Sequence, residues 1–137
     1  LGRKETVLSI IRSQFARYVG DCWEHLCRQY VSGNAIDGII YNVASRWWGK
    51  IFTSENKDGE MVEFDVVAES FDKKHILIGE CKWTNKEDAL RLVKSIETKI
   101  EYLPFVKKGQ SVHIILFLKC EPHNKESARI LYPSDIV

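Results

Sequence analysis

Two pairs of charged residues belong to two apolar stretches in the middle of this sequence. Glu63 and Asp65 lie in one apolar run, and Glu80 and Lys82 end the next, which covers residues 75–82. Both runs are typical of β-strands, in which alternate side chains point to the same face. Each pair therefore shares one face of its strand. We expect the two strands to be neighbours and the four charged side chains to border one pocket.

The composition is that of an ordinary globular domain. The chain has 137 residues, of which 45% are hydrophobic and 28% are charged, and this suits one domain with a single core. The longest apolar run, residues 114–118, is too short to cross a bilayer, so we expect no membrane insertion. Because the formal net charge is only +1, any contact with nucleic acid must come from a local group of residues.

The chain has no initiator methionine, and its only Met is at position 61. We therefore expect it to be part of a longer polypeptide. These residues contain no secretory signal pattern and no CxxC pair, which predicts a cytoplasmic protein with reduced thiols. The cysteines are Cys22, Cys27, Cys81 and Cys120.

Periodicity predicts a long helix at the start of the chain. Apolar residues recur at steps of three and four over residues 5–31, and the Ser32, Gly33 and Asn34 that follow are suited to ending a helix. The predicted apolar stripe consists of Leu8, Ile11, Phe15, Val19, Cys22, Leu26 and Tyr30.

The rest of the chain alternates between strand and helix signals. Three strands joined by polar turns precede a helix and a fourth strand that is apolar on both faces. Thr84 or Asn85 would cap this helix, and Pro104 would end it. The order helix, three strands, helix, strand predicts an α/β fold with a central mixed sheet flanked by helices. The predicted strands cover residues 45–52, 61–69, 75–83 and 111–118.

This arrangement resembles the PD-(D/E)XK nuclease superfamily. Its site combines an Asp on the second core strand with Glu-x-Lys on the third, and Asp65, Glu80 and Lys82 match these positions, with the two acids 15 positions apart (80 − 65 = 15). The resemblance implies a restriction-endonuclease-like core of order α-β-β-β-α-β that occupies residues 1–137 as one domain. It also implies hydrolysis of DNA with Mg²⁺ or Mn²⁺. Many relatives that cut duplexes act as homodimers, but this sequence leaves the oligomeric state open.

A narrower resemblance is to the uncharacterised domain found C-terminal to archaeal-type ATPases of the AAA+ class. It depends on Arg46-Trp-Trp48 and on the segments 63–68 and 79–83. The chain has no phosphate-binding GxxxxGKS/T loop and so cannot itself be the ATPase. The resemblance therefore implies an ATPase domain upstream in the same polypeptide.

The superfamily resemblance implies a role for each charged residue. Asp65 and Glu80 would bind the metal, and Lys82 would orient the attacking water or offset charge on the phosphate. Glu24 matches the first-helix Glu that completes the site in many members, although helical periodicity does not favour it. Glu63 is either a secondary ligand or a solvated residue. Two carboxylates about 4 Å apart repel by roughly 4 kcal/mol at an effective dielectric of 20, and a divalent cation reverses that sign.

The charged strand residues have an alternative interpretation as a solvated ladder on an exposed sheet face. Against it, Glu80 and Lys82 continue a stripe that contains Ile76 and Ile78. Two charges on an apolar stripe are costly unless they are paired or liganded, which favours the site.

Two further alternatives concern the aromatic segment and the whole domain. Arg46, Trp47 and Trp48 could bind nucleic acid, but we expect at least one of the two indoles in the core. The domain could also be a catalytically silent DNA- or protein-binding module of an ATPase, or an RNA-directed nuclease. Fold alone does not separate these functions.

Overall fold

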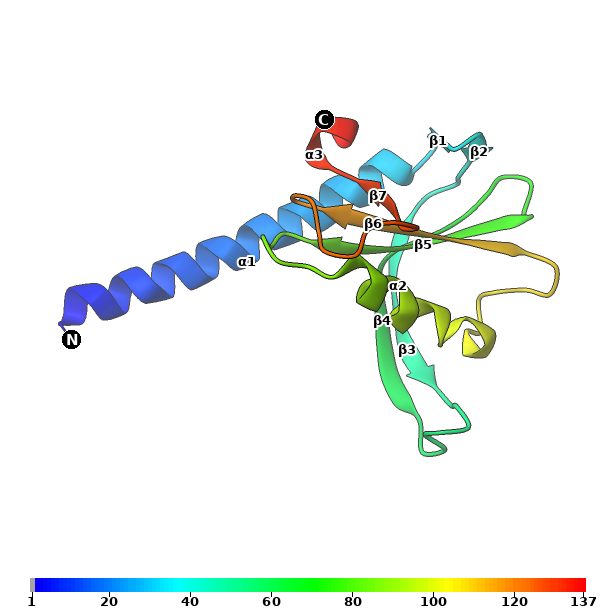
Figure 1. The fold of residues 1–137 in the computed structure, drawn as a ribbon, viewed down its shortest axis with the longest axis horizontal. Helices are drawn as coiled ribbons and strands as arrows, with labels where there is room; N and C mark the ends of the chain where they lie inside the picture. The colour runs from blue at the N-terminus through cyan, green and yellow to red at the C-terminus, as the bar shows by residue number, and fades with distance from the viewer. Residues whose placement is uncertain (1) are drawn as a thin grey trace.

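A five-stranded mixed sheet forms the centre of the protein, with helix α1 packed on one face and helix α2 on the other (Figure 1). The structure, a computed structural model, describes residues 2–137. Strands β3, β4 and β5 pair antiparallel, whereas β5, β6 and β7 pair parallel. The predicted α/β class is confirmed. The strands are β3 (Ser45–Ile51), β4 (Glu60–Glu69), β5 (His75–Lys82), β6 (Ser111–Leu118) and β7 (Arg129–Leu131), in that order across the sheet.

The predicted order α-β-β-β-α-β leaves out several short elements. Strands β1 (Ala35–Ile36) and β2 (Ile39–Ile40) form a hairpin whose turn residues, Asp37 and Gly38, have φ of 52° and 81°. Asp-Gly suits such a turn, but two-residue strands carry no periodic signal. At the C-terminus, β7 and the four-residue helix α3 (Pro133–Ile136) also extend the predicted order.

Helix α2 (Ala89–Glu97) begins later and ends earlier than predicted. Its cap is Asp88, whose carboxylate accepts a hydrogen bond from the Arg91 N–H at 3.2 Å, and not Thr84 or Asn85. The chain before it is held out of the helix because the His123 carbonyl accepts the Ala89 N–H. After Glu97 the helix gives way to a separate 3-10 turn, η1 (Ile100–Tyr102), before Pro104.

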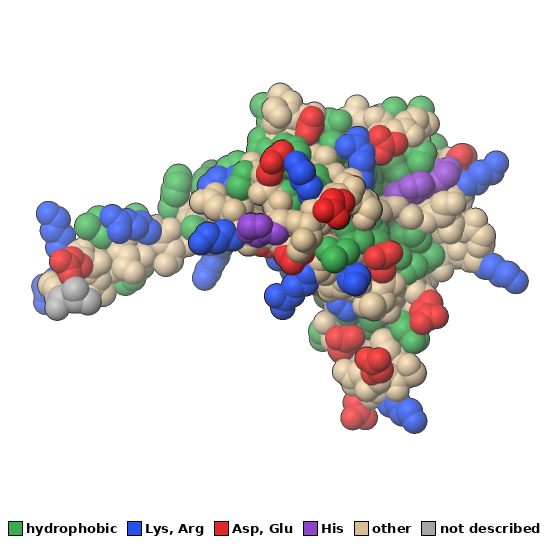
Figure 2. Space-filling model, in the orientation of Figure 1, with side chains coloured by type: hydrophobic (Ala, Val, Ile, Leu, Met, Phe, Trp, Pro, Cys, Tyr) green, Lys and Arg blue, Asp and Glu red, His purple; other side chains and the backbone are tan. Residues whose placement is uncertain are grey.

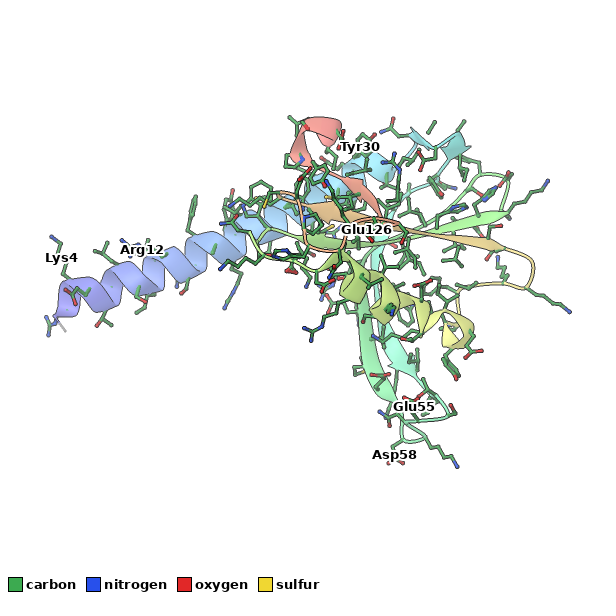
Figure 3. All side chains as sticks on the ribbon, viewed as in Figure 1. Lys4, Arg12, Tyr30, Glu55, Asp58 and Glu126 are labelled. Carbon is green, nitrogen blue, oxygen red and sulfur yellow. The ribbon has the colours of Figure 1, made fainter. Side chains whose placement is uncertain are left out.

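Helix α1 (Arg3–Val31) is continuous through Gly20 and packs on the sheet only with its C-terminal part. Its N-terminal half projects away from the sheet, so that its side chains, including the labelled Lys4 and Arg12, stand in solvent (Figures 1, 2 and 3). Although α1 has 29 residues, no helix within residues 2–137 is long and apolar enough to span a membrane.

The face of α1 that packs on the sheet differs from the predicted apolar stripe. The buried residues are Trp23, Cys27 and Val31, whereas Leu26 of the predicted stripe is exposed. The Trp23 indole N–H donates to the carbonyl of Phe117 on β6 at 3.0 Å. A buried indole needs such an acceptor, so this bond fixes the rotation of α1 about its axis.

Strand β5 is the central strand and is covered on both faces. Leu77 and Cys81 pack in the cluster that contains α1, and Ile76 and Ile78 pack in the cluster that contains α2. The continuously apolar sequence of β5 follows from this double burial.

Strand β4 changes face along its length. Between the pairs Trp47–Phe64 and Ser45–Val67, β3 advances by two residues and β4 by three, so β4 contains a β-bulge. As a result Phe64 packs on the α2 side of the sheet, while Val66 packs on the α1 side. Asp65 lies between them, inside the bulge.

Gly79 provides a test of the packing at the centre of the sheet. A Cβ there would lie 2.7 Å from the Phe117 ring and 3.3 Å from the backbone carbonyl of Ile115. We expect Gly79→Ala to lower the free energy of unfolding by about 1–3 kcal/mol, measured by urea denaturation.

The matched control is Gly20→Ala in α1, where a Cβ meets no other atom within 4 Å. Because alanine has the higher helix propensity, this control should raise the free energy of unfolding by up to about 1 kcal/mol. A loss of stability in the control equal to that of Gly79→Ala would contradict the packing described here.

Candidate active site

The candidate site lies where the β4–β5 ladder ends. The last backbone pair is Val66 with Gly79, and by the same register Asp65 then lies across from Glu80. At this point an Asp65 carboxylate oxygen, Oδ2, accepts the Cys81 N–H at 2.8 Å. The side chain thus takes the place of a ladder carbonyl, and the carboxylate of Asp65 is held beside the end of β5.

Glu80 is half-buried on the same side of β5 as Ile76 and Ile78. Its pKa is raised to about 8, first by burial and then by the negative charge of Asp65. Glu24 raises the pKa further, whereas the ammonium of Lys82 lowers it. The predicted residues Asp65, Glu80, Lys82 and Glu24 are therefore electrostatic neighbours.

Glu24 reaches this place because of how α1 is rotated. It follows the buried Trp23 in sequence, and its pKa is raised by burial and by the charge of Asp65. Periodicity of the apolar stripe did not favour Glu24, since that stripe is not the face that packs. The side chain was assigned by resemblance alone, and the docking of α1 explains how it comes to lie near β4.

Arg28, one helical turn after Glu24, is a further member of the site that sequence reasoning missed. Its guanidinium donates to the backbone carbonyl of Asp65 at 2.9 Å and lies 3.6 Å from the Glu24 carboxylate. It connects α1 to the bulge of β4 and lowers the pKa of Glu24. Its spacing of four from Glu24 was the one signal that could have found it.

Glu63 lies apart from this group, contrary to the expectation that it shares a face with Asp65. Alternation along a strand fails at the bulge, which adds one residue between Phe64 and Val67. The Glu63 carboxylate instead pairs with the guanidinium of Arg46 on β3 at 2.6 Å.

The two adjacent indoles of β3 have different surroundings. Trp47 stacks with Phe64 at 6.0 Å and contacts Phe105 at 5.0 Å between ring centroids, in the α2-side cluster. Trp47 is half-buried, so the expectation of one indole in the core is met only in part, by packing against the core. Trp48 is exposed, with the guanidinium of Arg46 5.3 Å from its ring centre.

The donor set at the site suits a hard divalent cation. Carboxylate oxygens from Glu24, Asp65 and Glu80 are the ligands that Mg²⁺ and Mn²⁺ prefer. The raised pKa values of Glu24 and Glu80 reflect burial first and then the negative charge of Asp65, which a cation would neutralise. Within residues 2–137, no three Asp, Glu, His or Cys side chains are already grouped closely enough to hold a metal. The carboxylates would have to draw together around an ion.

Comparison with known proteins gives one match. The model of the family DUF234, described as archaea bacterial proteins of unknown function, matches residues 1–95. No curated protein and no solved structure matches the chain. The matched region contains α1, β4 and β5 and therefore every charged residue of the candidate site, whereas β6 and β7 lie outside it.

The raised pKa of Glu80 predicts how stability depends on pH. Between the unfolded value of 4.5 and the folded value of about 8 the folded protein binds more protons, so the free energy of unfolding falls as the pH rises through this window. Glu80→Gln removes this loss. At pH 8 we expect the free energy of unfolding of the variant to exceed that of the unsubstituted protein by about 2–4 kcal/mol, and this difference should vanish near pH 4.5. The measurement is urea denaturation without divalent ions.

Glu63→Gln is the matched control, since it removes a carboxylate that is paired and half-exposed. Its effect on the free energy of unfolding should stay within about 1 kcal/mol at both pH values. The assignment of burial and charge repulsion to Glu80 would be wrong if Glu80→Gln showed no more pH dependence than this control.

Proposed function

The chain belongs to this family of archaeal and bacterial proteins of unknown function, and we propose that it is a metal-dependent nuclease domain that hydrolyses phosphodiester bonds of DNA. The observation that carries the proposal is that three carboxylates and one ammonium lie close enough together at the end of β5 for their charges to act on one another. The acids come from three different elements, α1, β4 and β5, and the amine comes from Lys82. Bringing like charges into a half-buried place is costly, which favours a role that uses them.

Each residue has a chemical role in this proposal. Asp65, Glu80 and Glu24 would hold Mg²⁺ or Mn²⁺, and the Cys81 N–H orients the carboxylate of Asp65 for this. The chemistry that such an ion supplies is polarisation of the phosphate and a lowered pKa of bound water. The ammonium of Lys82 would donate hydrogen bonds to the attacking water or to a phosphate oxygen and offset the charge that develops there.

Arginines supply the positive charge that a phosphate needs near three acids. Arg28 is tied to Asp65 and Glu24, and Arg46 lies close enough to both acids for their charges to act on it. On α1, basic side chains continue along the projecting half of the helix (Figure 2). They are Arg3, Lys4, Arg12 and Arg17. Local positive charge of this kind supports contact with a nucleic-acid backbone although the net charge is only +1.

The partners remain those implied by the resemblance. We propose that the domain acts in a longer polypeptide with an upstream ATPase of the AAA+ class, which would move DNA relative to the site. A homodimer would allow two such sites to cut opposite strands of a duplex. An RNA substrate would use the same residues.

A second candidate function is a nucleic-acid- or protein-binding module of the ATPase that does not cut. It is favoured by the lack, within the described residues 2–137, of a ready-formed group of three metal-binding side chains. The scaffold would then be kept for its binding surfaces.

Cleavage tests the first function directly. We expect the full chain to cut end-labelled DNA with Mg²⁺ or Mn²⁺ and not with EDTA, and we expect Asp65→Asn or Lys82→Ala to lower the rate by about 100-fold or more. Single-stranded DNA, duplex DNA and RNA of one sequence should be compared on denaturing gels.

Suitable controls are Lys108→Ala and Glu101→Gln, two exposed residues in the segment before β6, which starts at the opposite end of the sheet. Both variants should cut DNA at the rate of the unsubstituted chain. Cleavage that survives both site substitutions would exclude the nuclease assignment, and binding without cleavage under any metal would favour the silent module.

A further inference from the structure

We propose that Trp48 and Arg46 form a binding surface for one unpaired nucleobase and its adjacent phosphate, so that the domain prefers single-stranded or frayed nucleic acid. This inference rests on the proposed function and specifies its substrate. It assigns a role to the exposed half of the aromatic segment on β3.

The surroundings of Trp48 do not account for it as a core residue. Its side chain is 62% exposed, whereas its neighbour Trp47 is packed against two phenylalanine rings. Alternation along β3 places the two indoles on opposite faces of the strand. An exposed indole face is the surface on which single-stranded nucleic acids stack their bases, and stacking tolerates any base because every base has a π-face.

A pocket surrounds the exposed indole. Its volume is about 240 Å³, and Arg46, Trp48, Met61, Val62 and Glu63 line it. Met61 is 67% exposed and provides a flexible apolar wall across from the ring. An apolar floor with one cation and one anion at its edge suits a flat, polar-edged ring system such as a nucleobase.

Arg46 supplies the phosphate contact. Its guanidinium lies 5.3 Å from the centre of the Trp48 ring and 2.6 Å from the carboxylate of Glu63. Arginine binds carboxylate and phosphate through the same pair of N–H groups. Both side chains of this pair are about half-exposed, and exposed pairs contribute little free energy, so a phosphate can replace Glu63.

The binding surface adjoins the carboxylate site. Trp48 is the β-ladder partner of Glu63, which precedes Asp65 by two residues on β4. Arg46 also feels the charges of Asp65 and Glu24. A strand whose base stacks on Trp48 would therefore lead its backbone toward Asp65 and Glu80.

This geometry selects against intact duplex. In the interior of a duplex each base is covered by its neighbours above and below, so no face there is free to stack on an indole. Loss of one base-stacking contact by alanine substitution weakens binding about 5- to 150-fold.

The experiment measures binding without cleavage. Fluorescence anisotropy of a labelled oligothymidylate, with the full chain in EDTA at low salt, gives the Kd for each variant. We expect Trp48→Ala to raise the Kd about 10-fold and Trp48→Phe to raise it less than about 3-fold, because phenylalanine still stacks. A blunt duplex of the same length should bind Trp48→Ala and the unsubstituted chain equally.

Phe71→Ala is the matched control, since Phe71 is 60% exposed and lies in the turn that joins β4 to β5 at the end of the sheet away from the site. Its Kd should not change. An abasic oligonucleotide should bind the unsubstituted chain about 10-fold more weakly than oligothymidylate does. For Trp48→Ala the two oligonucleotides should have equal Kd values. Urea denaturation of each variant verifies that it is folded.

The Arg46–Glu63 pair gives an independent readout. Glu63→Gln frees the guanidinium and removes a negative charge, so it should lower the Kd for oligothymidylate about 2- to 5-fold. A higher Kd in Glu63→Gln would overturn the exchange of carboxylate for phosphate.

The outcomes separate this inference from the proposed function. An unchanged Kd in folded Trp48→Ala, or an equal increase for duplex and single strand, overturns the base-binding surface even if Asp65-dependent cleavage is found. Binding that depends on Trp48, in a chain that cuts nothing with any metal, overturns hydrolysis and supports the surface proposed here.

Discussion

The burial of β5 on both faces is the constraint on which the rest of the structure depends. This strand pairs antiparallel with β4 and parallel with β6, and α1 and α2 close over its two sides. Gly79 lets the Phe117 ring and β4 approach where no larger residue fits. The buried part of β5 up to this glycine therefore carries no Asp, Glu, Lys or Arg. Glu80 and Lys82 come after it, where the ladder with β4 has ended while the pairing with β6 continues.

Helix α1 completes this arrangement from the other side of the sheet. Trp23 is anchored to Phe117 by its indole N–H, and the rotation that results brings Glu24 and Arg28 to the bulge of β4. The site thus depends on a contact between residues 94 positions apart. This group of acids costs stability, since burial and the charge of Asp65 both raise the pKa values of Glu24 and Glu80. Such a cost is typical of functional sites.

The two indoles of β3, at adjacent positions, have opposite surroundings. Trp47 packs in one aromatic cluster with Phe64 and Phe105, and this packing holds the β3–β4 arm against the segment after η1. The arm extends from the sheet as α1 does on another side, and its tip carries the labelled Glu55 and Asp58 (Figures 1 and 3). Trp48 can remain exposed on this arm because its neighbour supplies the core contact.

Local pattern predicted much of the fold and half of the candidate site. Strand alternation and helix periodicity are properties of short segments, so the four longest strands and the two main helices could be predicted from their own residues. The ends of α2 could not, because the contact with His123 that sets its start joins distant segments. The short strands β1, β2 and β7 lack the length over which a period can be recognised.

The sequence by itself determined that Glu80 and Lys82 share one side of a buried strand, because alternation within a strand needs no other part of the chain. Only the tertiary structure decided that Glu24 and Arg28 join them, since the rotation of α1 is set by the packing of Trp23. The tertiary structure also decided that Glu63 does not join Glu80 and Lys82. A one-residue bulge of β4 against β3 changes the face of every residue beyond it. The docking of α1 and the bulge in β4 both depend on contacts between segments that are distant or separate in the sequence, so neither can be predicted from one segment alone.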